Sequence, residues 1–350
     1  MAPRERRFDD LARAGQTRRL ARLATAALAG YDVEPVRIVP MRRGFNTTFR
    51  IDAAGGDRFV LRIQRRDGPD AAMVRSEMAW LAALRRDTDM GVPEPVPTRD
   101  GDLQTVVTGG GVPEPRSCVL YRWVHGRFVD EQLTEGHLAR VGAFTARLHA
   151  HGAGFVPPPG FRRGGVDHVT AFGRTSPDGL APEVAEHAAE IVDAVWPAGG
   201  GDLVRTVIDK ARAARDEIGR DPDVYGLIHA DLHQENYLFH RGRVRAIDFD
   251  DCGYGPFVYD LAVTLSELSG RSRYPALRAA MLAGYRTVRP LTARHERLID
   301  AFIALRNMQL TMWAVEHRAE PMFRDSWTRW LESGLHAVRP FATSDCSNID

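Results

Sequence analysis

A short polar segment, residues 229–236, holds the side chains best suited to chemistry in this chain. It reads His-Ala-Asp-Leu-His-Gln-Glu-Asn and is followed by Asp248-Phe249-Asp250-Asp251. Between them lie apolar runs at residues 237–239 and 244–247, separated by Arg-Gly-Arg, and this pattern predicts a tight β-hairpin. Because a hairpin brings its two outer ends together, we expect Asp231, Asn236 and Asp248 to converge.

Two carboxylates and an amide at one place suit magnesium-dependent phosphoryl transfer. Asp231 can orient an attacking hydroxyl and accept its proton, and it is the predicted catalytic residue. Asn236 and Asp248 can hold Mg²⁺ against nucleotide phosphates. Asp250 could bind a second magnesium ion or face the substrate. The alternative interpretation is a polar surface hairpin with carboxylates placed there by chance.

The motif His-x-Asp-x-x-x-x-Asn, then Ile-Asp-Phe-Asp, then Tyr259-Asp260-Leu261-Ala262, resembles the aminoglycoside phosphotransferase and choline kinase-like superfamily, which is related to protein kinases. The run from Asp248 to Pro256 looks nearest to its homoserine kinase-like and stress-response Ser/Thr kinase-like branch. The resemblance implies a two-lobed α+β fold of protein-kinase type. It also implies that Asp260 anchors the backbone of the catalytic loop.

The expected domains are a nucleotide-covering lobe over residues 1–122, made of a small antiparallel sheet and a helix, and a larger, mainly helical lobe over residues 123–342. That second lobe would carry the catalytic hairpin and bind the acceptor. The polar tail at residues 343–350 is expected to be disordered. No internal repeat or long low-complexity tract interrupts this division.

Three short strands are predicted in the first lobe, at residues 36–39, 49–51 and 59–63. The turn around Gly44 can offer backbone N–H groups to phosphates, with Asn46 and Thr47 as further donors. An ordinary hairpin turn explains the same residues. An amphipathic helix is expected at residues 15–30, where a transit peptide is the alternative.

A buried carboxylate is predicted on the helix at residues 69–86. Met73, Glu77, Leu81 and Leu84 share one helical face, so Glu77 lies in an apolar stripe and needs a cation. Arg62 is the candidate. In the family that this chain resembles, a lysine at this place pairs with the glutamate and contacts the α- and β-phosphates. Arg62 keeps the positive charge, but its guanidinium is planar and forked where the lysine ammonium is compact. Either Arg62 takes over the role of the lysine, or nucleotide binding is weaker or altered.

The connection between the lobes is expected near residues 121–126. Proline- and glycine-rich connectors are predicted at residues 91–97 and 109–115, followed by a strand at 118–121. By resemblance, backbone groups between Tyr121 and Trp123 would hold the adenine. Core packing is the alternative role for the Trp123 side chain.

The second lobe is expected to contain helices at residues 138–149, 181–195, 203–218, 261–268 and 298–317. On the last of these, Arg306, Trp313 and His317 fall on one face. By resemblance, late helices of this kind line the acceptor pocket, so these three side chains are candidate substrate-binding residues. A packed helix with a partly exposed arginine is the alternative.

The composition is ordinary for a globular protein and excludes few functions. The 350 residues carry a formal net charge of +1, which argues against a nucleic-acid-binding surface. No apolar run has the length of a membrane span, and no secretory core follows the N-terminus. The three cysteines lack the spacing of a zinc site or disulfide framework, so a cytoplasmic location is expected.

The sequence thus predicts an ATP- and Mg²⁺-dependent phosphotransferase that modifies a hydroxyl of a small molecule, such as an amino alcohol, an aminoglycoside-like compound or another hydroxylated metabolite. A Ser/Thr kinase acting on a peptide or protein is the second interpretation. A nucleotide-binding regulator without transferase activity is the third, because of Arg62 and the sparse glycine turn.

Overall fold

The structure, a computed structural model, describes residues 7–43, 46–66, 68–129, 132–166, 180–196, 199–320 and 323–344. The chain divides into two compact units. Unit 1 consists of Met1–Arg127, Val156–Arg163 and Leu238–Asp250, and unit 2 consists of Phe128–Phe155, Gly164–Tyr237 and Asp251–Asp350. The first segment of unit 1 ends near the boundary expected at residue 122, and two later segments also belong to this unit.

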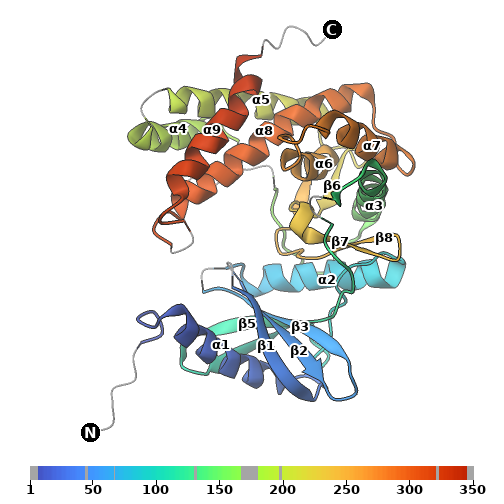
Figure 1. Ribbon diagram of the computed structural model, residues 1–350. Coiled ribbons are helices and arrows are strands. Elements are labelled where there is room, and N and C mark those ends of the chain that lie inside the picture. The colour runs from blue at the N-terminus through green and yellow to red at the C-terminus, as the bar shows by residue number, and fades with distance from the viewer. Residues whose placement is uncertain are drawn as a thin grey trace. The chain divides into compact units, whose positions relative to one another are not determined.

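Unit 1 is built around a five-stranded antiparallel sheet in the order β1-β2-β3-β5-β4 (Figure 1). Its strands are β1 (Pro35–Arg43), β2 (Thr47–Ala53), β3 (Arg58–Ile63), β4 (Thr105–Gly109) and β5 (Val112–Arg122). Helix α1 (Arg13–Leu28) packs its apolar side on the sheet. Alternation along β3 directs Phe59, Leu61 and Ile63 into this core, so Val60 and Arg62 lie on the other face.

Helix α2 (Ala71–Asp87) faces that second side of the sheet (Figure 1). It begins at Asp70, whose side chain accepts a hydrogen bond from the Met73 N–H. The expected helix and its buried Glu77 are therefore confirmed.

One expected connector is wrong. Residues 109–115 include a tight turn and the start of β5, because Gly109, Gly110 and Gly111 all adopt positive φ and reverse the chain. The prolines of this segment lie where β5 pairs with β4 alone, and an open strand edge tolerates a residue that lacks an N–H.

The predicted β-hairpin is confirmed, but residues 238–250 belong to unit 1 and not to the second lobe that was expected to carry it. Strands β7 (Tyr237–His240) and β8 (Arg243–Ala246) form a two-stranded sheet. Arg241 and Gly242 both have positive φ, which is the conformation of the two-residue turn that matches strand twist.

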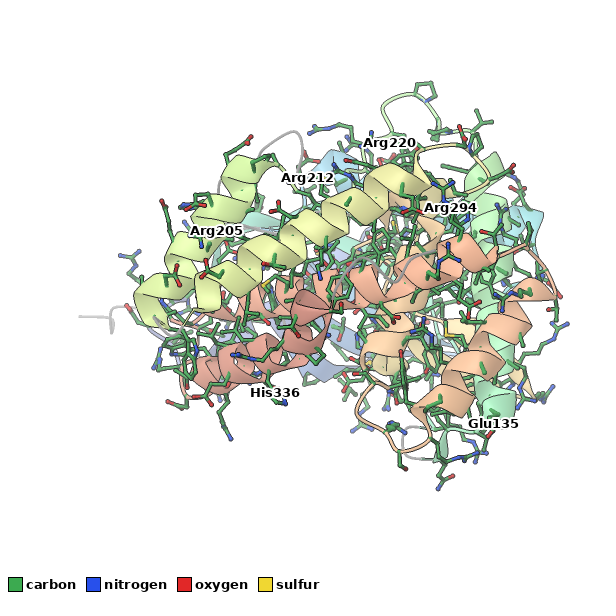
Figure 2. All side chains as sticks on the ribbon, turned by 90° about the horizontal axis from the view of Figure 1, so that it is seen from above. Glu135, Arg205, Arg212, Arg220, Arg294 and His336 are labelled. Carbon is green, nitrogen blue, oxygen red and sulfur yellow. The ribbon has the colours of Figure 1, made fainter. Side chains whose placement is uncertain are left out.

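Unit 2 is mainly helical. Its helices are α3 (Glu135–Gly154), α4 (Pro182–Val195), α5 (Gly200–Ile218), α6 (Phe257–Ser266), α7 (Tyr274–Arg286), α8 (Ala293–Glu316) and α9 (Trp327–Thr343). The short strands β6 (Tyr225–Ile228) and β9 (Gly253–Pro256) pair antiparallel. Arg205 of α5 donates to Glu186 of α4 at 2.8 Å, and Arg294 of α8 donates to Glu217 of α5 at 2.7 Å (Figure 2).

The end of α9 corrects one expectation. Thr343 is the last residue of this helix and Ser344 follows it, so the helix enters the range predicted as a disordered tail. Residues 345–350 of that tail lie outside the described residues. None of the described helices combines the length and the apolar character that spanning a membrane would require.

Candidate active site

Arg62, Glu77 and Tyr121 form a buried polar cluster in unit 1. Arg62 Nη2 donates to Glu77 Oε2 at 2.5 Å, and the Tyr121 hydroxyl donates to Glu77 Oε1 at 3.0 Å. The side chains of Arg62 and Glu77 are 4% and 2% exposed. The predicted ion pair is thus present, and Tyr121, expected to act through its backbone, joins it through its side chain.

The charges in this cluster are fixed by its surroundings. Burial alone would lower the pKa of Arg62, but the charge of Glu77 outweighs it and holds this pKa well above its usual value. Burial raises the pKa of Tyr121 well above its usual value. Arg62 is therefore a permanent cation and Tyr121 a neutral donor.

Asp248 extends the cluster toward solvent. Arg62 Nη1 lies 3.9 Å from Asp248 Oδ1, and the Asp248 side chain is 48% exposed. Its backbone has φ of 65°, a left-handed conformation that non-glycine residues rarely adopt. Phe249, 1% exposed, packs edge-on against Trp80 with ring centroids 5.6 Å apart. This anchor holds the strained residue in place, and such strain is typical of functional sites.

Asp250 is connected to the predicted phosphate-binding turn. Asn46 Nδ2 donates to Asp250 Oδ2 at 2.7 Å, and the Asn46 Oδ1 accepts from the Arg65 N–H at 3.3 Å. Arg163 donates to the Asp250 carbonyl. Both polar ends of the Asn46 amide thus have protein partners. Thr47 is 7% exposed in β2, and Gly44 lies outside the described residues.

The segment expected to hold adenine already uses two of its backbone donors. The Arg122 N–H donates to the Glu94 carbonyl at 2.9 Å, and the Trp123 N–H donates to the Arg58 carbonyl at 3.0 Å. The Trp123 side chain is half-buried. An adenine in this place would therefore rely on other groups of the segment.

In unit 2, Asp260 anchors the loop that carries Asp231, and this prediction is confirmed. Its carboxylate accepts hydrogen bonds from the His229 N–H at 3.0 Å and the Ala230 N–H at 2.6 Å. His149 Nε2 lies 3.1 Å from the same carboxylate. Ala230 adopts φ of 67°, so the two bonds hold an unfavourable backbone conformation just before Asp231.

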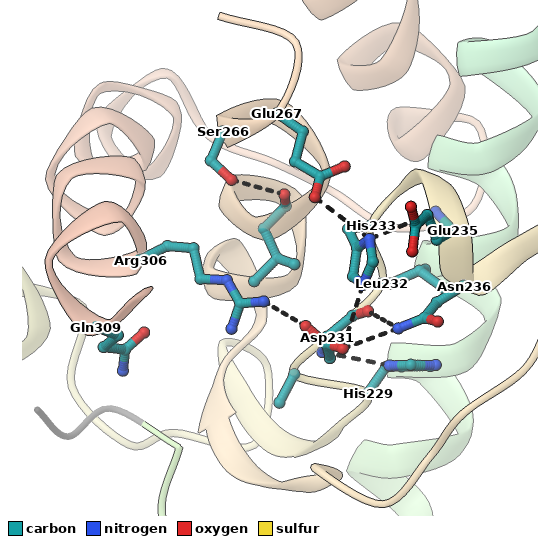
Figure 3. A network of polar contacts seen from close by, with 12 residues as sticks. His229, Asp231, Leu232, His233, Glu235, Asn236, Ser266, Glu267, Arg306 and Gln309 are labelled. Carbon is teal, nitrogen blue, oxygen red and sulfur yellow. Dashed lines mark hydrogen bonds and ion pairs between the residues drawn. The ribbon is translucent and has the colours of Figure 1, made fainter. Parts of the chain in front are cut away.

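Both carboxylate oxygens of Asp231 have partners in unit 2 (Figure 3). Asn236 Nδ2 donates to Oδ2 at 2.8 Å, and His233 Nε2 lies 3.4 Å from the same oxygen. Arg306 of α8 makes an ion pair with Oδ1. Asp231 retains 16% side-chain exposure, so a ligand can still reach it.

These partners determine protonation. Burial alone would raise the pKa of Asp231, but the hydrogen bond with His233 and the charge of Arg306 hold it below its usual value. Burial would lower the pKa of His233, but its hydrogen bonds with Asp231 and Glu267 raise it to about 10. Asp231 is thus a carboxylate and His233 an imidazolium near neutral pH.

The candidate substrate-binding residues, two on α8 and His317 just after it, separate into two groups. Arg306 contacts Asp231, whereas Trp313 and His317 pack with Phe323. The centroids of Trp313 and Phe323 are 4.7 Å apart, and His317 Nδ1 lies 2.9 Å from the Trp313 carbonyl. The contact between Arg306 and Asp231 was not predicted. Helical periodicity shows which residues share one side of a helix, but it does not show which residues that side contacts.

The predicted magnesium ligands offer suitable chemistry. Asn236 bonds Asp231 through its Nδ2, so its carbonyl oxygen remains the atom that a cation would use. Asp248 and Asp250 supply carboxylate oxygens, and Mg²⁺ prefers such oxygens together with phosphates and water. Across the described residues, no three His, Cys, Asp or Glu side chains gather as a metal site.

Comparison with known proteins gives a consistent family assignment. A family model described as the phosphotransferase enzyme family matches residues 37–298. The homoserine kinase of Gluconacetobacter diazotrophicus is 29% identical over 272 residues, covering 74% of each chain. The amicoumacin kinase of Bacillus subtilis is 27% identical over 215 residues, covering 59% of this chain and 56% of its own.

A solved structure, that of the microcompartment-associated aminopropanol kinase, matches with a TM-score of 0.76 and 31% identity. The match covers 94% of this chain and 98% of that one. The α+β, protein-kinase-like fold expected from the motifs is thereby confirmed.

Proposed function

The chain belongs to the phosphotransferase enzyme family, and from this we propose that it transfers the γ-phosphoryl group of ATP to the hydroxyl of a small amino alcohol or related metabolite. The observation that carries the proposal is the setting of Asp231. This carboxylate is ionised, partly exposed and held by Asn236, His233 and Arg306 on a loop anchored by Asp260. Asp231 would accept a hydrogen bond from the acceptor hydroxyl and aim its oxygen at the phosphorus.

Unit 1 would bind the nucleotide phosphates. Arg62, kept cationic by Glu77, supplies the charge that the family's lysine would supply. Gly44, Asn46 and Thr47 remain the proposed phosphate-binding turn, and the segment from Tyr121 to Trp123 the proposed adenine contact.

A magnesium ion would be held by Asn236 and Asp248, with Asp250 as a further ligand. The bound ion neutralises charge on the phosphates during transfer. The chain's own contribution is to fix these oxygens, through Asp231 for Asn236, through Phe249 packing for Asp248 and through Asn46 for Asp250.

A basic acceptor group would suit the charges around Asp231. Asp251 is exposed and acts electrostatically on Arg306, and Glu267 is 38% exposed beside His233. Carboxylates in the surroundings of Asp231 would favour a substrate amine. The homoserine and aminopropanol named for two relatives both carry one.

The binding roles of Trp313 and His317 remain part of the proposal. Trp313 and His317 are half-buried beside the buried Phe323, at the end of the helix that carries Arg306. A cytoplasmic location and the lack of a nucleic-acid partner also remain proposals, supported by cysteine content and net charge.

The test is mass spectrometry after incubation with Mg-ATP and pooled acceptors. The pool contains L-homoserine, 1-amino-2-propanol, other amino alcohols, aminoglycosides and Ser/Thr peptides. We expect one amino alcohol to gain a single phosphoryl group. Phosphorylation of peptides alone would overturn the small-molecule assignment. Tight Mg-ATP binding without any transfer would favour the regulator interpretation.

A further inference from the structure

Arg306 covers one of the two carboxylate oxygens of Asp231. Its guanidinium pairs with Asp231 Oδ1, and its side chain is 14% exposed (Figure 3). Tyr259 lies within hydrogen-bonding reach of the guanidinium, and the Tyr259 hydroxyl donates to Gln309 Oε1 at 2.6 Å. Arg306 is thus held by Tyr259 as well as by Asp231.

The other carboxylate oxygen is engaged by the loop itself. Asp231 Oδ2 accepts from Asn236 at 2.8 Å and lies 3.4 Å from His233 Nε2. An incoming hydroxyl must therefore bind at Oδ1, next to or in place of the Arg306 guanidinium. A charge-assisted hydrogen bond is among the stronger ones in proteins, so a weakly bound molecule displaces it poorly.

We propose that Arg306 is a specificity-determining residue that excludes water as the phosphoryl acceptor. The inference rests on the proposed function. In transfer, the acceptor oxygen bonds to the γ-phosphorus, the bond from that phosphorus to the β–γ bridging oxygen breaks, and ADP leaves. Asp231 receives the hydroxyl proton. Water in the same place would give ADP and inorganic phosphate by the same exchange of bonds.

The acceptor can displace Arg306 from Asp231 because its other contacts with the protein supply binding energy that water lacks. A substrate that carries a hydrogen-bond acceptor near its hydroxyl, such as a carboxylate, carbonyl or second hydroxyl, can accept the N–H groups of Arg306 as the guanidinium leaves Oδ1. Hydroxyl compounds with such a neighbouring group are thereby favoured as acceptors.

The test measures phosphate release from Mg-ATP with no acceptor present. We expect Arg306→Met to raise the rate about tenfold over the unmutated protein, the effect of losing one strong hydrogen bond to a charged group. Arg306→Lys should be intermediate and serves as the second variant if the methionine variant does not fold. The double variant Arg306→Met with Asp231→Asn should lose the increase, because hydrolysis runs through Asp231.

Arg271→Met is the matched control. Arg271 is a partly buried arginine that donates to Gln234 of the same loop at 2.9 Å. Its loss should leave acceptor-free hydrolysis unchanged, while melting temperature and Mg-ATP affinity report on folding.

No increase in either Arg306 variant would overturn the inference, as would an equal increase in Arg271→Met or one that survives Asp231→Asn. If the unmutated protein still phosphorylates an acceptor, only the inference fails. If it neither transfers nor hydrolyses, the proposed function fails and the inference with it.

Discussion

Arg62 of unit 1 and Arg306 of unit 2 each pair with a carboxylate, but the two pairs differ in exposure. Arg62 is enclosed with Glu77, and neither side chain has more than a few per cent exposure. Arg306 and Asp231 are more accessible, at 14% and 16%. We therefore expect Arg62 to support structure and nucleotide binding together, and Arg306 to act on the acceptor side.

Replacing Arg62 by alanine should weaken both the fold and ATP binding. Glu77 would remain buried without its cation, which costs about 3–5 kcal/mol of the free energy of unfolding. The KM for ATP should rise at least about tenfold because the charge beside the phosphates is lost. Thermal unfolding and initial-rate kinetics measure the two effects.

Arg58→Ala is the control, since Arg58 lies on the same strand, is 53% exposed and pairs with Asp52. It should change neither quantity appreciably. An unchanged KM for ATP in a folded Arg62→Ala protein would contradict the assignment of Arg62 to the nucleotide.

Part of the site was readable at the residue scale. Glu77 was found because a carboxylate in an apolar helical stripe needs a cation, and Arg62 was the available one. The contact of Arg306 with Asp231 joins residues 75 positions apart and depends on how α8 packs. No local pattern carries that information.

Among the elements, α3 and α7 pack so closely that glycine is required on both. A Cβ on Gly142 would lie 2.0 Å from the Met281 carbonyl oxygen, and one on Gly284 would lie 1.9 Å from the Ala139 carbonyl oxygen. This packing holds His149 Nδ1 3.0 Å from the Tyr285 hydroxyl, and His149 in turn contacts Asp260, which anchors the loop that carries Asp231.

Gly142→Ala should therefore destabilise the protein by about 1–3 kcal/mol or more, because backbone atoms must move to admit the methyl group. Chemical denaturation measures this change. Gly136→Ala on the same helix is the control, since its nearest neighbours would be 3.9 Å away. It should leave stability unchanged or raise it slightly, and equal losses in both variants would contradict the packing argument.

Two of the strands that were missed lack a local signal. Strands β6 and β9 have four residues each, too few to show an alternating pattern. The β7–β8 hairpin was predicted correctly because a two-residue turn with glycine separates two apolar runs. The strand through residues 112–115 was missed because prolines normally mark a connector.

At the scale of the whole molecule, acid stability should depend on the buried His149. Burial outweighs the effect of Asp260 and lowers the pKa of His149 from 6.5. As the pH falls below 6.5, the unfolded chain takes up a proton that the folded protein does not bind at this site. Stability is then lost between that pH and the lower folded-state pKa.

The contribution of His149 to the free energy of unfolding should thus fall between pH 6.5 and pH 5.5, and His149→Gln should remove this contribution. His151→Gln, on the same helix, leaves the buried imidazole in place and should keep the full pH dependence. A fall of the same size in the His149 variant would contradict the linkage.

The family assignment and the type of fold were accessible from the motifs, because the catalytic loop and hairpin are contiguous in sequence. The division of the chain into two units was harder to predict from the sequence. Unit 1 includes residues 156–163 and 238–250 in addition to its first segment. Whether a later segment belongs to unit 1 depends on contacts between residues distant in sequence. A single boundary placed in the sequence therefore describes the division only in part.

The most direct test of the central claim is to compare Asp231→Asn with the unmutated protein, once the acceptor is known. Turnover and the Kd for Mg-ATP are measured side by side. We predict a loss of about 10²–10⁴-fold in kcat, the range for a group that positions or accepts a proton, with Mg-ATP affinity little changed. Full turnover in the variant, or loss of Mg-ATP binding in place of turnover, would contradict the assignment of Asp231 as the catalytic residue.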